Sequence, residues 1–249
     1  VWTLLTHLFR KASVQMDTDP DIKYFKRQRA LAAVFVVFFA VSSSTSSWDW
    51  LMSIDAHWFS TLYGWYTFSG LLVSTVAMMI LIVIFLKKKG YMKHVNDEHM
   101  HDLGKYLFAF SILWMYLWFS QYMLMWYSNI PEETVYFVAR LKDHSTLFYV
   151  NLILNFLLPL LILMARSAKR MDWIAGTVAV VIIAGHWVDY FLAIMPGVAG
   201  ENTNIGFFEI GLTIGYLGLF LMVVFYGLTK ASLIPANHPY YKESLEYHT

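Results

Sequence analysis

The stretch that decides the fold class is STLYGWYTFSGLLVSTVAMMILIVIFL, from Ser60 to Leu86, which contains no charged residue. A helix needs roughly 20 consecutive apolar residues to cross the hydrocarbon core of a bilayer. This stretch is long enough to do so, and three lysines follow it directly at positions 87–89. It therefore predicts a transmembrane helix with one end at a membrane surface.

The composition of the whole chain indicates that lipid covers much of its surface. Of the 249 residues, 58% are hydrophobic and only 14% are charged, whereas an average soluble domain has about 25% charged residues. The chain has no cysteine, which excludes disulfides, thiolate-bound zinc, cysteine-held iron–sulfur clusters and covalent c-type haem. Any redox cofactor is therefore expected to be non-covalent or to belong to a partner.

Five further stretches share this apolar character, so we expect an all-α, polytopic membrane bundle of about six transmembrane helices. The first expected span differs from the others, because its second half is the hydroxyl-rich run SSSTSS, which we expect to pack against protein. The expected spans are 30–47, 60–86, 106–127, 146–165, 173–195 and 207–228.

The expected spans divide the chain into three parts: an N-terminal segment at 1–29, a transmembrane domain at 30–228 and a tail at 229–249. Residues 1–13 have apolar side chains at helical spacing and predict an amphipathic helix on the membrane surface. The alternative is that they end an element of a longer chain, which the start at Val1 rather than Met would suit.

The distribution of Lys and Arg predicts the orientation of the spans. Sixteen of the 18 basic residues fall in the N-terminal segment, the second and fourth loops and the tail; only Arg140 and Lys142 fall on the opposite side. Cytoplasmic loops carry the excess of positive charge in membrane proteins. Both termini are therefore expected in the cytoplasm.

Polar residues inside a span are costly in lipid, so each is a candidate for function. On the fifth span, His186 lies ~20 Å and Asp189 ~24 Å from the cytoplasmic start at Trp173. These two residues share one helix face with Tyr190. Glu209 lies in the first turn of the sixth span. All four are therefore expected in the outer half of the membrane.

The remaining candidates lie on the same expected side. The first loop carries two acids and a histidine, and we expect Asp55 to be buried near His57 or a partner subunit, because it lies on an apolar stripe of helical period. The candidates for a proton path are His186, Asp189, Glu209, Asp55, His57 and Asp49, and the expected polar cavity adds Tyr190, Gln121, Asn151 and Asn155.

Structural roles compete with each of these interpretations. Amides inside spans commonly hydrogen-bond neighbouring helices, and His186 with Asp189 could be a satisfied structural pair. Only His186 lies inside an expected span among the histidines, so a haem held by two histidines is not expected. The sequence contains no nucleotide-binding motif, and it predicts no catalytic residue, bound cofactor or metal site in this chain.

Two long motifs carry a resemblance to a known family. They are WDWLMSIDAHWFSTLYGWYTFSG, residues 48–70, and HDLGKYLFAFSILWMYLWFSQYMLMWYSNIPEET, residues 101–134. Both resemble the F subunit of bacterial alternative complex III, a quinol:electron-acceptor oxidoreductase. That subunit is one of two NrfD-like, or polysulfide-reductase-like, membrane proteins in the complex. Members of the family have about ten spans, so this chain, with six, resembles their C-terminal part.

The resemblance implies a bacterial inner-membrane subunit with periplasmic partners. These would be the second NrfD-like subunit, an iron–sulfur and molybdopterin-like subunit and c-type cytochromes, together with lipids and without nucleic acid. Quinone or menaquinone would act at the level of the complex, with haem c and iron–sulfur clusters in the partners. The family's supported quinol site belongs to the other NrfD-like subunit, so the resemblance implies a non-redox role here, in proton movement or assembly.

The function expected from the sequence is a membrane subunit of a quinol-oxidising respiratory complex. It would supply an outer-half polar cavity for proton transfer or quinol contact and would anchor periplasmic redox subunits. A purely structural anchor is one alternative. A secondary transporter is another, although the spans show no convincing pair of inverted, interrupted repeats.

The predicted topology can be tested with reporter fusions. A reporter fused after Thr249 should be cytoplasmic, and a reporter inserted near Gly200 should be periplasmic, because of the asymmetry in basic residues. Compartment-specific enzyme activity of the reporters would measure both. An external C-terminus would overturn the orientation and the depths assigned from it.

Overall fold

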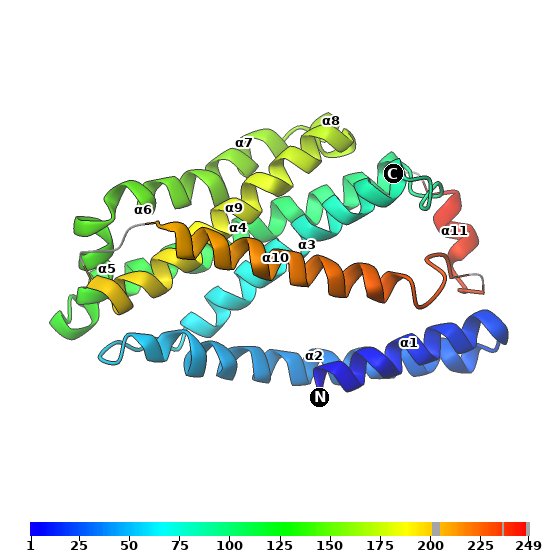
Figure 1. Cartoon of the computed structure of the whole chain (residues 1–249), viewed down its shortest axis with the longest axis horizontal. Helices are drawn as coiled ribbons and strands as arrows, with labels where there is room; N and C mark the ends of the chain where they lie inside the picture. The colour runs from blue at the N-terminus through cyan, green and yellow to red at the C-terminus, as the bar shows by residue number, and fades with distance from the viewer. Residues whose placement is uncertain (201–204, 236, 248–249) are drawn as a thin grey trace. The chain divides into compact units, whose positions relative to one another are not determined.

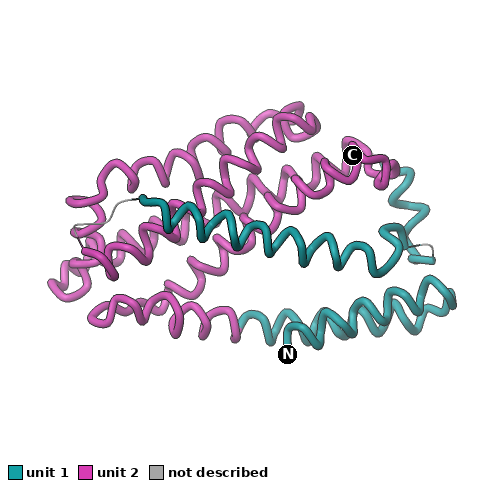
Figure 2. The backbone as a smooth tube through the Cα atoms, in the orientation of Figure 1, with its two compact units in different colours: residues 1–40, 204–249 teal, residues 41–203 magenta. Residues whose placement is uncertain are grey.

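The computed structural model describes residues 1–200, 205–235 and 237–247. The structure is 83% helical, and the described residues contain no β-strand, so the predicted all-α class is confirmed. Six helices within this described part of the chain are long and apolar enough to cross a membrane, as the sequence predicts. The chain divides into two compact units, residues 1–40 with 204–249 and residues 41–203 (Figure 2).

Contacts between aromatic side chains join helices within the first unit. Its helix α1 buries Leu5, Ala12 and Met16 on one face, which agrees with the amphipathic pattern. Phe9 of α1 meets Phe35 of α2 edge-to-face, with 6.3 Å between ring centroids. Within this unit no residue of α10 is buried. The elements are α1 (Trp2–Thr18), the first part of α2 (Ile22–Trp50), α10 (Phe207–Leu228) and α11 (Tyr241–Leu245) (Figure 1).

The second unit is a helix bundle in which α3 packs against both α4 and α9. Its elements after the end of α2 are the 3-10 turn η1 (Met52–Ile54), α3 (Tyr63–Lys88), α4 (Asp97–Ser128), α5 (Pro131–Asp143), α6 (Ser145–Leu152), the π-helical turn η2 (Ile153–Leu157), α7 (Leu158–Leu163), α8 (Arg166–Arg170) and α9 (Asp172–Ala199). The core is apolar, and its fully buried members include Val73, Ala77, Ile80, Leu107, Trp114, Ala179 and Ile182.

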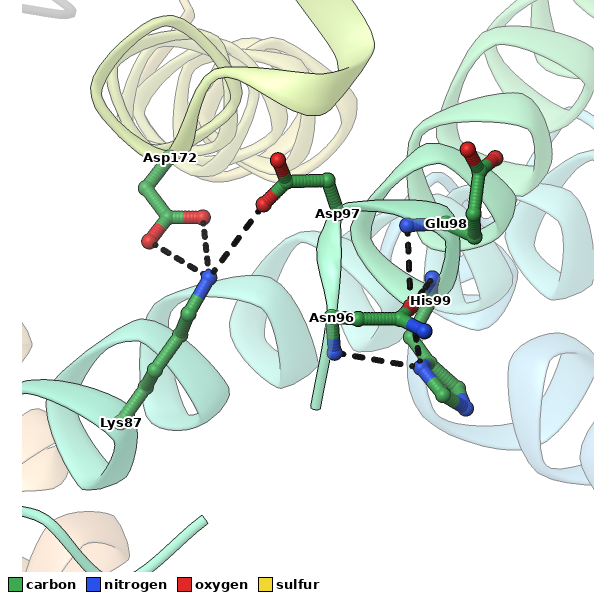
Figure 3. Close-up of polar contacts among 6 residues, drawn as sticks. All are labelled: Lys87, Asn96, Asp97, Glu98, His99 and Asp172. Atoms are coloured by element: carbon green, nitrogen blue, oxygen red, sulfur yellow. Dashed lines mark hydrogen bonds and ion pairs between the residues drawn. The ribbon is translucent and has the colours of Figure 1, made fainter. Parts of the chain in front are cut away.

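An ion pair and a helix cap fix one end of this bundle. Lys87, at the end of α3, lies 3.0 Å from the Asp172 carboxylate in the first turn of α9 and 3.9 Å from that of Asp97 (Figure 3). The Asn96 side chain accepts hydrogen bonds from the backbone N–H groups of residues 98 and 99. This cap starts α4 at Asp97, ahead of the apolar segment that begins at residue 106, because a capping amide satisfies the first orphan donors of a helix.

Two segments differ from the sequence-based expectation. The segment 131–143, expected as a loop, is the helix α5, with Pro131 in its first turn and Arg140 and Lys142 in its last turn. The apolar stripe expected across residues 48–59 is broken, because α2 ends at Trp50 and a 3-10 turn follows.

The hydroxyl-rich run of α2 is satisfied largely by its own helix. Thr45 Oγ1 donates to the Val41 carbonyl at 3.1 Å, and Ser47 Oγ donates to the Ser44 carbonyl at 2.7 Å. Ser44 also meets α3 closely, since a Cβ added at Gly64 would lie 3.1 Å from the Ser44 Cβ. Protein contact therefore covers part of the run, and hydrogen bonds back along the helix allow Thr45 to be exposed.

Candidate functional site

The carboxylate of Asp189 is the centre of a buried polar network in the second unit. Asp189, on α9, is 5% exposed. Its Oδ1 accepts a hydrogen bond from Asn151 Nδ2 of α6 at 2.8 Å, and its Oδ2 accepts one from Trp114 Nε1 of α4 at 3.3 Å. Three helices therefore meet at one carboxylate.

The network continues along one face of the fourth span. Asn155 Nδ2 donates to Asn151 Oδ1 at 2.5 Å, and both residues are fully buried. Asn155 lies in the π turn η2, where the N–H of Leu158 bonds the carbonyl of Ile153 instead of that of Leu154. Pro159 follows and has no N–H for the Asn155 carbonyl. The wider turn accommodates the proline, and π turns of this kind occur frequently at functional sites.

His186 lies beside the network without hydrogen-bonding to it. Its side chain is 4% exposed, and its Nδ1 lies 4.0 Å from Asp189 Oδ2. Neither ring nitrogen has a hydrogen-bond partner among the described residues. The ring packs edge-on against Trp114 and lies next to Gly70, where an added Cβ would be 3.6 Å from the imidazole. The predicted pair is therefore close in space, but a direct proton transfer would need the atoms to approach further.

A small cavity opens beside Asp189. Its volume is about 20 Å³, which is enough for one water molecule. It is lined by Tyr66, Trp118, Gln121, Tyr136, Phe137, Arg140, Phe148, Asn151, Asp189, Leu192 and Ala193. The lining brings together the side chains of three predicted residues, Gln121, Asn151 and Asp189, with a cation from α5.

Arg140 supplies that cation and is held by backbone carbonyls. Its side chain is 4% exposed. Nε donates to the Leu192 carbonyl at 2.9 Å, Nη2 to the Ala193 carbonyl at 3.0 Å and Nη1 to the Tyr136 carbonyl at 2.8 Å. Pro196 stands four residues after Leu192 and lacks the N–H that the Leu192 carbonyl would otherwise accept. Arg140 therefore replaces a helix hydrogen bond that the proline removes.

Aromatic rings cover the guanidinium of Arg140. Its Cζ lies 3.2 Å from the centroid of the Tyr136 ring, which stacks in turn on Trp58 at 3.8 Å. Burial raises the pKa of Tyr136, while the Arg140 charge opposes that rise. The phenol therefore stays neutral at physiological pH.

The predicted residues of the first loop lie at the edge of this site. Asp55 is about a third exposed rather than buried, and its Oδ2 lies 3.8 Å from Nη1 of Arg140. His57 and Asp49 are exposed. The side-chain partner of Asp55 is thus an arginine that follows in sequence only after two more spans.

The remaining predicted residues lie outside the cavity lining. Tyr190 is half-buried on α9. Glu209 belongs to the first unit, where its Oε2 accepts a hydrogen bond from the Gly206 N–H at 2.8 Å and caps α10. The role of Glu209 in a proton path stays a prediction.

Sequence reasoning missed Arg140, Trp114 and α5. Arg140 was counted only as a loop charge, although Tyr136, Phe137 and Arg140 share one face of a helix that starts at Pro131 with two glutamates in its first turn. Proline and acids at the start of a helix, with basic residues in its last turn, are recognisable signals. Those signals could have identified α5.

No protein-family model matches the chain, and no curated protein is similar enough to count as a match. The resemblance to NrfD-like subunits therefore rests on the motifs quoted above. Within the described residues, no group of three or more His, Asp or Glu side chains is placed to hold a metal ion.

The close approach of α6–η2 to α9 predicts the effect of one substitution. A Cβ added at Gly185 would lie 2.5 Å from Asn155 Oδ1 and 2.9 Å from the Leu154 Cβ. Gly185→Ala should therefore destabilise the protein by about 1–3 kcal/mol, the usual cost of overpacking a core. Thermal unfolding of the purified protein would measure the loss.

The matched control is Gly211→Ala on α10. A Cβ at this position meets no atom within 4 Å, so its thermal stability should equal or slightly exceed that of the wild type, because alanine favours helix over glycine. Equal stability of the Gly185 and Gly211 variants would contradict the packing described for α9.

Proposed function

We propose that the chain is a membrane subunit of a quinol-oxidising respiratory complex similar to alternative complex III, in a bacterial inner membrane. Its part in the complex is proton transfer through the polar network around Asp189. Its partners are the periplasmic iron–sulfur and c-type cytochrome subunits and a second NrfD-like subunit. The observation that carries the proposal is a buried carboxylate that has hydrogen-bond donors from two other helices and borders a water-sized cavity.

Burial of the Asp189 carboxyl within a transmembrane helix has a free-energy cost. An ionisable side chain within a transmembrane helix is expensive and marks a functional site by default. The donors from Trp114 and Asn151 suit an ionised Asp189. A protonated Asp189 needs an acceptor for its own O–H. Asn151 Oδ1 accepts one hydrogen bond from Asn155 and keeps a second lone pair, and the neighbouring cavity has room for a water that could also accept. The proposed exchange of protons runs through that cavity.

The volumes favour proton transfer over quinol contact. The cavity beside Asp189 measures about 20 Å³, and a neighbouring pocket between the end of α4 and α5 measures about 170 Å³. Both are below the roughly 300–1,000 Å³ typical of ligand pockets. A larger hollow of about 550 Å³ lies in the first unit and is lined by residues of α2 alone. Neither space near Asp189 therefore suits a quinol, and we assign quinol oxidation to a partner subunit.

One observation favours a structural anchor as the second candidate. Both hydrogen bonds to Asp189 come from other helices, and bonds of this kind also hold membrane helices together. The two candidates differ in what the removal of the Asp189 charge does to turnover and to assembly.

Purification tests membership of a complex. A mild-detergent preparation isolated through a tag on this chain should carry haem c and iron–sulfur absorbance, because those cofactors belong to the proposed partners. Visible spectroscopy and subunit mass spectrometry would measure both. A colourless preparation containing this chain alone would contradict membership of the complex and favour a transporter.

Substitution of Asp189 tests proton transfer. Asp189→Asn should slow quinol oxidation or proton release by about tenfold or more, since positioned acid–base groups contribute typically 10²–10⁴-fold. Both carboxylate oxygens accept hydrogen bonds from N–H donors. The amide that replaces the carboxylate has only one oxygen, so its NH₂ group faces one of these donors and the protein should lose about 1–3 kcal/mol of stability. Stopped-flow turnover, proton release into a weakly buffered medium and subunit content would be measured together.

The matched control is Asp143→Asn, which removes an exposed acid at the end of α5. It should leave turnover and assembly unchanged. An assembled Asp189→Asn complex with wild-type turnover and proton release would reject the proton-transfer role, and loss of assembly would support the anchor.

A further inference from the structure

Arg140 is a buried cation with carboxylates from two other elements nearby. It lines the cavity together with Asp189 of α9, and its Nη1 lies 3.8 Å from Oδ2 of Asp55, which is about a third exposed. Three of its five N–H groups are committed to the carbonyls of Tyr136, Leu192 and Ala193. These bonds hold the guanidinium in place, so its charge acts from a fixed position.

We propose that Arg140 is a positioning residue for the protonation of Asp189, and that Asp55 tunes it from the surface. The fixed guanidinium stabilises the Asp189 carboxylate across the cavity that both residues line, and so favours release of its proton into the cavity. Asp55 carries the opposite charge, lies 3.8 Å from Arg140 and offsets part of this effect. As a step in proton release, the inference rests on the function proposed above; the electrostatic coupling itself does not.

Other charged or titratable groups also face Asp189, and most of them are phenols. They are Tyr63 and Tyr66 from α3, Tyr136 from α5, and His186 and Tyr190 from α9 itself. A tyrosine is neutral at physiological pH unless its environment favours the ion, which leaves His186 as the neighbour whose charge must be controlled in an experiment. Arg140 and Asp55 complete the set and carry opposite charges.

The geometry requires shifts of opposite sign from two substitutions. Arg140→Gln removes the cation, so the protonated-carboxyl band of Asp189 should persist to a higher pH than in the wild type. Asp55→Asn removes the balancing anion, so Asp189 should lose its proton at a lower pH. The second shift should be smaller, because solvent screens a partly exposed charge. Arg140→Lys keeps the charge and should titrate near the wild type.

Infrared titration of the purified full-length protein measures these shifts directly. The protonated-carboxyl band of Asp189 is identified by its loss in Asp189→Asn, and its intensity is followed against pH in each variant. The measurements are repeated in a His186→Gln background, so that titration of the imidazole does not contribute. Glu132→Gln is the matched control, because Glu132 is an exposed acid at the start of α5, and it should leave the titration unchanged.

A purely structural Arg140 gives a different set of results. Arg140→Gln and Arg140→Lys would then both lose thermal stability, and neither substitution nor Asp55→Asn would move the titration. That outcome would overturn the inference even if the Asp189→Asn complex turned over slowly, as the proposed function expects. Shifts of opposite sign would support the coupling, and they can be observed even if the assembled complex shows no dependence on Asp189. Asp55→Asn alters a partly exposed side chain, so it tests the coupling even if the Arg140 variants fail to fold.

Discussion

The second unit depends on the hydrogen bonds that satisfy the buried carboxylate of Asp189. Burial of a carboxylate costs several kcal/mol unless hydrogen bonds or charges compensate it. Here the compensation comes from Trp114 on α4 and Asn151 on α6, so the positions of three helices are tied to one side chain. The approach of α6–η2 is possible because position 185 of α9 is glycine, where any Cβ would strike Asn155.

Two prolines interrupt helical hydrogen bonding on either side of this carboxylate, and the chain resolves each interruption differently. Before Pro159 the backbone widens into the π turn that contains Asn155. Before Pro196 the side chain of Arg140 takes over the carbonyl of Leu192. Kinks and irregular turns in membrane helices persist where other groups satisfy the freed backbone. Both irregularities therefore lie where polar side chains gather.

Hydropathy was enough to predict the helices that could span a membrane. Polar groups are costly in lipid, so a span appears in the sequence as a long stretch with few of them. It also identified Asp189, Asn151, Asn155 and Gln121, since polar residues stand out within apolar spans. Partners could not be assigned in this way. The contact between Asp55 and Arg140 joins two segments far apart in sequence, and no periodicity within either segment specifies it. α4 begins at Asp97, nine residues ahead of the predicted span 106–127, because a polar cap and not hydropathy sets the start of the helix.

The hydrogen-bond partners of Asp189 in the structure differ from the partner that sequence spacing suggests. Sequence spacing pairs it with His186, one turn away, yet their nearest polar atoms are 4.0 Å apart and share no hydrogen bond. The two N–H donors to Asp189 come instead from Trp114 and Asn151 on other helices. A carboxyl that takes up a proton must direct it to an acceptor, and the cavity with the fixed charge of Arg140 at its wall lies directly beside it. In the proposed role, protons would therefore exchange through the cavity, while the ring of His186 packs against Trp114.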